Sequence, residues 1–143
     1  MDAYKVLLGE ILVQRKKITR QQLETALQEQ RQKGGFLGEV LVGLGLLDER
    51  DIVVALIIQC GLPYIAVNKY LIDPQTVRLI PPDIAHREKI IALDRIGEIL
   101  SIVAMDPLTE EKKKYLEDLT LCRVVSFIST KTEIEEAIAR NYA

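Results

Sequence analysis

The stretch FLGEVLVGLGLLDERDIVVALIIQ, residues 36–59, decides the fold, because a related stretch, LLGEILVQRKKITRQQLETALQEQ, precedes it at residues 7–30. When the two are aligned at an offset of 29 positions, 8 of the 24 residues are identical. Further pairs are conservative, such as Ile11 with Val40. A match of this extent predicts that one supersecondary element has been duplicated.

Each copy has the pattern of a helical hairpin. In the first copy we expect a helix over residues 8–15, a turn, and a second helix that begins at Thr19. Gln22 lies three residues after Thr19, which is the spacing of a capping box. In the second copy Asp48 takes the capping position. The second helix of each copy then has one regular face, formed by Leu23, Ala26, Leu27 and Gln30 or by Ile52, Ala55, Leu56 and Gln59.

The turns and glycines of the two copies differ in an informative way. Gly45 falls where the end of a helix favours a left-handed residue. The first copy has Lys16 there, which costs about 1 kcal/mol if the turn is kept. Gly9 and Gly38 are poor helix formers near a helix start. We expect them to permit a close approach, either between the hairpins or by a ligand.

The second half of the chain mixes strands with helices. We expect Asp73 to cap a short helix, residues 94–98 to form a hairpin loop, and Ser129 or Thr130 to cap the last helix. The expected strands cover residues 64–67, 89–93, 99–105 and 124–128, and the expected helices cover residues 74–79, 82–86, 110–119 and 131–141.

These elements predict an α+β fold. Tandem helical hairpins at residues 1–60 would pack on a small C-terminal α/β subdomain at residues 61–143, which would contain a sheet of three to four strands. The length of 143 residues suits one domain or two small subdomains that share a core.

Composition excludes several classes of protein. The net charge of −2 and the pI near 5.5 argue against a nucleic-acid partner. The longest apolar run, residues 52–58, is far shorter than the roughly 20 residues of a membrane span. No signal peptide is visible at the N-terminus. We therefore expect a cytoplasmic location without direct membrane insertion, and free, buried thiols at Cys60 and Cys122.

No residue pattern predicts catalysis or metal binding. His86 is the one histidine, and a helix-end histidine is more often structural than catalytic. The two cysteines have no CxxC spacing, so a metal site would have too few ligands. No nucleophile has a partner at suggestive spacing, and no Walker A motif is present. We expect no catalytic residue, no metal and no enzyme activity.

The second helix of the second copy is apolar nearly all round. If Ile52, Ala55 and Leu56 face the core, the outer face carries four further apolar residues, Val53, Val54, Ile57 and Ile58. Such a helix is buried on both sides, either by the second subdomain or by a protein partner. Both alternatives stay open.

The chain resembles a known family. The resemblance lies in the doubled L-G-E-x-L-V and L-x-x-A-L-x-x-Q phrases, then N-K-Y-x-I-D-P, A-M-D-P-L and E-I-E-x-A-I. Together they are similar to the N-terminal domain of type II secretion and type IV pilus assembly ATPases, from about Lys5 to Tyr142. The resemblance implies a non-catalytic regulatory or docking domain. It would link its own or an associated ATPase motor to the cytoplasmic domain of an inner-membrane platform protein, and would lie at the membrane through that partner.

Some members of this family bind cyclic di-GMP through the paired phrases. Carried over by position, the resemblance implies a nucleotide site at Leu8, Gly9, Leu23, Leu27, Gln30, Leu37, Gly38, Ile52, Leu56, Gln59 and Asp106. However, Leu7 and Phe36 stand where those members have arginines. Because a charge-assisted hydrogen bond contributes roughly 1.5–3 kcal/mol, the loss of two would weaken binding by ~10²–10⁴-fold. We expect no cofactor, and the cyclic di-GMP sensor remains the alternative to the docking domain.

Overall fold

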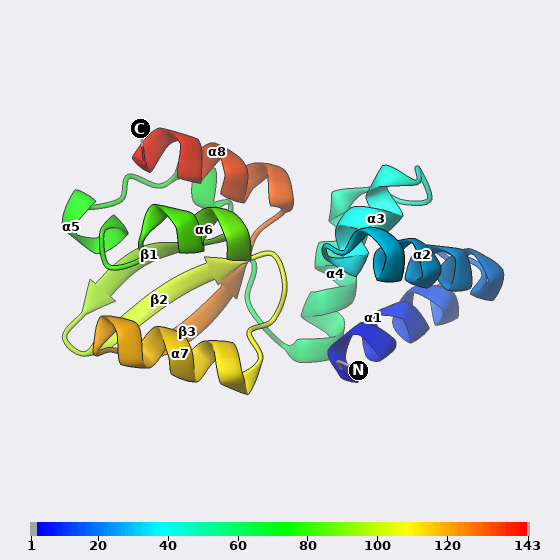
Figure 1. Cartoon of the computed structure of the whole chain (residues 1–143), viewed down its shortest axis with the longest axis horizontal. Coiled ribbons are helices and arrows are strands. Elements are labelled where there is room, and N and C mark those ends of the chain that lie inside the picture. The colour runs from blue at the N-terminus through cyan, green and yellow to red at the C-terminus, as the bar shows by residue number, and fades with distance from the viewer. Residues whose placement is uncertain (1–2, 143) are drawn as a thin grey trace. The chain divides into compact units, whose positions relative to one another are not determined.

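The computed structural model describes residues 3–142, with side chains from Leu8 onward. The chain divides into two compact units, Met1–Gly61 and Leu62–Ala143 (Figure 1). Each unit is described by itself. The first is entirely helical over its described residues, and the second combines helices with a sheet, so the fold class is the predicted α+β.

The first unit contains the two predicted hairpins. In its described part the helices are α1 (Ala3–Gln14), α2 (Arg20–Lys33), α3 (Leu37–Gly43) and α4 (Glu49–Cys60). Helix α1 packs against α4, and α2 packs against α3, in addition to the contacts within each hairpin. Exchanging the two copies exchanges these two pairings, so the hairpins are approximately equivalent. Their core is apolar and is centred on Leu8, Leu12, Leu37, Leu41 and Leu56, which are at most 2% exposed.

Both predicted helix caps are confirmed. The Thr19 hydroxyl accepts a hydrogen bond from the Gln22 amide at 3.1 Å, and the Gln22 side chain accepts one from the Thr19 amide at 2.8 Å. Asp48 and Asp51 form the same reciprocal pair at the start of α4, at 2.9 and 3.1 Å. Each box satisfies amides that a helix start leaves without intrahelical partners.

The second unit is built on a mixed three-stranded sheet. Its elements are η1 (Val67–Lys69), α5 (Pro74–Val77), α6 (Pro82–Glu88), β1 (Ile90–Ile96), β2 (Ile99–Ala104), α7 (Glu110–Thr120), β3 (Arg123–Ile128) and α8 (Lys131–Asn141). Strands β1 and β2 are antiparallel, and β2 and β3 are parallel. A parallel pair needs a crossover connection, which α7 supplies. Figure 1 shows α7 beside β3, with α6 and α8 at the other edge beside β1.

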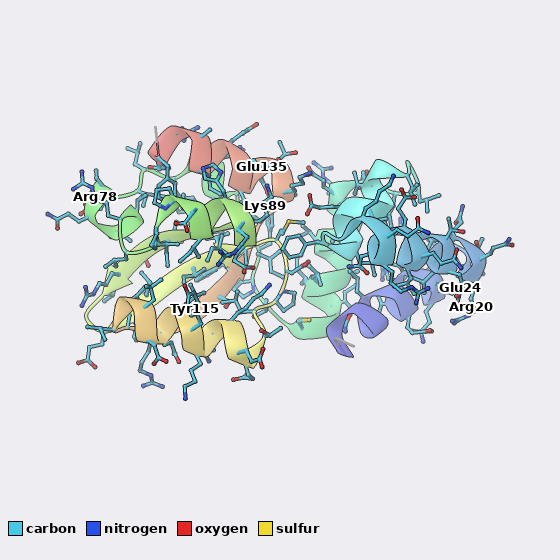
Figure 2. The ribbon with its side chains drawn as sticks, in the orientation of Figure 1. Arg20, Glu24, Arg78, Lys89, Tyr115 and Glu135 are labelled. Atoms are coloured by element: carbon cyan, nitrogen blue, oxygen red, sulfur yellow. The ribbon has the colours of Figure 1, made fainter. Side chains whose placement is uncertain are left out.

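Polar contacts tie the elements of this unit together. Ser129, fully buried, donates a hydrogen bond to the Ile65 carbonyl and accepts one from the Val67 amide, which fixes the segment before η1. Lys89, with a φ of 56°, ends α6 and places its ammonium group 3.1 Å from the Glu135 carboxylate on α8 (Figure 2). Of the two predicted caps for α8, Thr130 is the one used.

Several predicted boundaries in this unit are wrong. Residues 64–67 do not form a strand, because only Tyr64 bridges to Ile128 before the Ser129 contacts turn the chain into η1. Residues 94–96 belong to β1, so the hairpin turn is only Gly97 and Glu98. A glycine with a φ of 61° suits such a two-residue turn.

The two short helices also differ from their predicted ends. Helix α5 stops at Val77 rather than at residue 79, because the chain tightens into turns ahead of Pro81, where the preceding residue is pushed out of the helical region. Helix α6 continues past His86 to Glu88.

The structure bears on the expectations about membrane spans, metal sites and thiols. No helix in the described part of the chain is long and apolar enough to cross a membrane. Residues 3–142 contain no group of three or more His, Cys, Asp or Glu side chains that could hold a metal ion. Cys122 is buried, whereas Cys60 is exposed, contrary to the prediction.

Candidate functional site in the tandem repeat

The glycines of the two Leu-Gly-Glu triplets mark the closest approach within each hairpin. A Cβ on Gly9 would lie 2.7 Å from Leu23 Cδ1, and a Cβ on Gly38 would lie 3.4 Å from Ile52 Cγ2. Leu23 and Ile52 are equivalent positions of the repeat. The prediction of a close approach between the hairpins or by a ligand is therefore wrong in its partner, because the helix that approaches each glycine belongs to the same hairpin.

The turns between the helices of each hairpin have the same backbone geometry but different side chains. The Lys17 amide bonds to the Leu12 carbonyl and the Lys16 amide to the Val13 carbonyl, and the equivalent residues of the second copy repeat both bonds. This is the Schellman arrangement, which needs a left-handed residue. Lys16 has a φ of 59° and Gly45 a φ of 75°. The first turn presents exposed basic residues, whereas the second presents Leu44, 39% exposed.

Ion pairs hold the first turn in place. Arg20 donates two hydrogen bonds of 2.9 Å to the Glu10 carboxylate, and this contact lowers the pKa of Glu10 below its usual value. Lys17 lies 3.3 Å from Asp51, so the first turn lies beside the start of α4. The Arg20 position of the second copy is Glu49, so the bidentate pair has no counterpart there.

The structure separates the residues of the implied nucleotide site into two groups. The equivalent leucines Leu8 and Leu37 are 0% and 2% exposed, so they form core contacts within the first unit. Leu23, Ile52 and Leu56 are buried there too, and Leu27 is partly exposed. Asp106 follows β2 in the second unit. Phe36 is the half-buried residue before α3, and the side chain of Leu7 lies outside the described side chains.

The two glutamines of the repeat are used differently. Gln30 is 9% exposed, and its amide donates a hydrogen bond of 3.0 Å to the Gly35 carbonyl, which pins the link between the two copies. Gln59 is partly exposed, but its side-chain oxygen is buried and has no hydrogen-bond partner among the described residues. A buried acceptor without a partner costs free energy, so this oxygen is a candidate contact for a donor from outside the protein.

The outer faces of α2 and α4 also differ in chemistry. On α4, Val54, Ile57 and Ile58 are 41%, 39% and 56% exposed. The equivalent residues of α2 are all polar, namely Thr25, Gln28 and Glu29. One copy therefore has an ordinary solvated face, and the other has an exposed apolar face. We call Val54, Ile57 and Ile58 the α4 apolar face.

The prediction that Val53 lies on this face is wrong. Val53 is 7% exposed and belongs to the core, although its equivalent in the first copy is the exposed Glu24. Sequence reasoning also missed the contrast between the two outer faces. The alignment of the copies at an offset of 29 positions contains that signal, because it pairs each exposed apolar residue of α4 with a polar residue of α2.

Comparison with known proteins decides the family. The model of the MshEN domain matches residues 60–143, which is more than half of the chain. The chain belongs to the MshEN domain family. The type IV pilus assembly ATPase PilB of Myxococcus xanthus is 31% identical over 136 residues, which cover 95% of this chain and 24% of the relative. PilB of Thermus thermophilus is 33% identical over 137 residues, which cover 94% of this chain and 15% of the relative.

Solved structures agree with this assignment. The structure of MshE with cdg superposes with a TM-score of 0.74 at 29% identity, and covers 94% of this chain and 98% of that one. The N-terminal domain of XpsE superposes with a TM-score of 0.83 at 20% identity, and covers 100% of this chain and 99% of that one, which shows a shared fold.

The predicted relationship to the N-terminal domains of secretion and pilus ATPases is thus confirmed. The MshEN domain is the non-catalytic N-terminal part of those proteins, so this domain is not itself an enzyme. The chain spans only 24% and 15% of the length of the two PilB relatives.

Proposed function

We propose that this MshEN domain is a docking module. Its α4 apolar face binds a protein of a type II secretion or type IV pilus assembly system, at the cytoplasmic side of the inner membrane. The partner is the cytoplasmic domain of the inner-membrane platform protein, and the domain thereby links an ATPase motor to that platform.

The contrast between α2 and α4 carries this proposal. Both helices are capped in the same way and occupy equivalent places in the repeat, so the fold alone does not require an apolar outer face on α4. Burying three exposed aliphatic side chains against a partner removes apolar surface from water, which contributes roughly 25 cal/mol per Å². An exposed, contiguous apolar surface is typical of protein interfaces.

The experiment replaces the residues of the α4 apolar face with the equivalent residues of α2. The triple variant Val54→Thr, Ile57→Gln, Ile58→Glu should lose capture of the platform protein's cytoplasmic domain in a pull-down with purified proteins. The matched control, Thr25→Ala with Gln28→Ala on α2, should capture it as well as the wild type does. Undiminished capture by the triple variant would place the interface elsewhere.

A nucleotide sensor is the second candidate, and the unpartnered Gln59 oxygen favours it. A purine amino group is a donor of the kind that this oxygen lacks. The ligand would be cyclic di-GMP or a related dinucleotide, in contact with Gln59 of the first unit. In place of the family's arginines, Phe36 could stack on a base, which contributes ~1–3 kcal/mol.

Calorimetry separates the two candidates. Titration of the domain with cyclic di-GMP at about 100 μM tests the sensor, because loss of two charge-assisted contacts moves a micromolar site beyond that range. Heat of binding that disappears in Gln59→Leu would establish the sensor. Absence of heat would remove it and leave the docking proposal untouched.

A further inference from the structure

The register of the sheet places six side chains of the second unit on one face, in two rows. Ile96 pairs with Ile99 and Ile99 with Arg123, and Asp94 pairs with Ser101 and Ser101 with Val125. Directly paired residues share a face of a sheet, and residues two apart along a strand do too. The rows therefore run across the order β1, β2, β3 as Ile96, Ile99, Arg123 and as Asp94, Ser101, Val125.

This half-face is exposed, whereas the other side of the same strand segments is buried on β2 and β3. Ile96, Ile99 and Val125 are 75%, 46% and 43% exposed. On the opposite side, Leu100 is 0% and Val124 is 3% exposed. The exposure is therefore a property of one face and not of frayed strand ends.

The charges on this half-face lie at opposite corners. Asp94 is on β1 in one row, and Arg123 is on β3 in the other row. Within residues 3–142 neither side chain forms an ion pair. Ile96 lies at the third corner and Val125 at the fourth. Ile99 lies between Ile96 and Arg123 in the middle of its row.

We propose that this half-face binds a second copy of the same chain. A two-fold interface is self-complementary, so each pair of residues meets twice. A two-fold axis that runs parallel to the sheet face and perpendicular to the line from Asp94 to Arg123 brings Asp94 of each copy to Arg123 of the other, while Ile96 meets Ile99. Two ion pairs thus flank an apolar centre. The proposal is independent of the docking function, since it concerns a different surface.

Other occupants fit this region less well. An added peptide strand would need a free sheet edge. On β3 the Val124 amide bonds to the Glu117 side chain and the Ile128 amide to the Pro63 carbonyl, and α5, α6 and α8 pack against β1, the other edge strand. An anionic lipid surface would need net positive charge, whereas Asp94 and Glu98 balance Arg95 and Arg123. A second copy offers a negative charge to Arg123 and a positive charge to Asp94.

Charge reversal tests the proposal. In sedimentation velocity over about a hundredfold range of concentration, the wild-type chain should shift from monomer to dimer, with the weak affinity of a small interface. Asp94→Arg and Arg123→Asp should each raise the dissociation constant at least about tenfold, because each places like charges together. The double variant, which exchanges the two charges, should restore the dimer.

Two further variants keep the result interpretable. Ile96→Thr keeps a β-branched residue in β1 and should weaken the dimer, with an unchanged thermal midpoint for the monomer. Lys114→Glu changes an exposed residue of α7 by the same charge as Arg123→Asp and should leave the dimer intact. A wild type that stays monomeric throughout, or a double variant that fails to dimerise, would overturn the proposal.

Discussion

Gly9 and Leu23 pack so closely that a Cβ on Gly9 would lie 2.7 Å from one methyl group of Leu23 and 2.9 Å from the other. The equivalent Gly38 leaves 3.4 Å to Ile52. The same glycine in the same repeat is therefore needed for space in the first hairpin, whereas in the second it leaves room for a methyl group.

Alanine at these two glycines should have different effects on the free energy of unfolding. Alanine is a better helix former than glycine by roughly 0.8–1 kcal/mol. Gly38→Ala should therefore raise the free energy of unfolding by about that amount. Gly9→Ala forces the buried Leu23 to move, and overpacking costs typically about 1–3 kcal/mol, so it should be neutral or destabilising. Urea unfolding of both variants checks this, and equal stabilisation by both would refute it.

Exchanging the residues at the two left-handed positions should change the free energy of unfolding in opposite directions. Lys16→Gly should raise the free energy of unfolding by about 1 kcal/mol, because it removes the strain of a side chain at a φ of 59°. Gly45→Lys should lower it by a similar amount. Thermal unfolding of both variants measures the difference. A destabilised Lys16→Gly variant would mean that the lysine makes a contact that outweighs the strain.

The Ser129 hydroxyl should contribute substantially to the free energy of unfolding. Ser129→Ala leaves the Ile65 carbonyl and the Val67 amide without their side-chain partner, and an unsatisfied buried group costs about 1–3 kcal/mol. Chemical denaturation should show a loss of about 2 kcal/mol, with hydrogen exchange fastest at residues 64–69. A loss below about 0.5 kcal/mol would show that water replaces the hydroxyl.

Tyr142 should make the second unit sensitive to alkali. Its hydroxyl donates to the Val77 and Ile80 carbonyls, at 3.0 and 2.8 Å, and burial raises the pKa of Tyr142 to about 12. The folded state keeps a proton that the unfolded state, with a pKa near 10, gives up. The stabilisation is thus complete below about pH 10 and is lost between about pH 10 and 12. The stability difference between the wild type and Tyr142→Phe should shrink across that window, and a constant difference would contradict the assignment.

Local signals in the sequence predicted the first unit well. The capping boxes at Thr19 and Asp48 and the left-handed positions at Lys16 and Gly45 depend on residues within one turn of each other. Such patterns act within one helix or turn, so they do not depend on what the hairpin packs against. The glycines were predicted to permit a close approach between the hairpins or by a ligand, and that partner is wrong, because the choice of partner depends on how the helices pack.

Predictions that depended on tertiary contacts failed. Residues 64–67 have the composition of a strand, but the Ser129 hydroxyl turns the backbone away after one bridge. Val53 is buried although the repeat pairs it with the exposed Glu24. In both cases burial and hydrogen bonds from distant segments outweighed the local pattern.

The central claim is that duplication produced two equivalent helices and that only α4 carries the docking face. Backbone amide spectra of the ¹⁵N-labelled domain, recorded while the platform protein's cytoplasmic domain is added, test it most directly. The account predicts that the amide shifts concentrate at Val54, Ile57 and Ile58 and spare the equivalent Thr25, Gln28 and Glu29. Shifts of equal size on both helices, or on α2 alone, would contradict it.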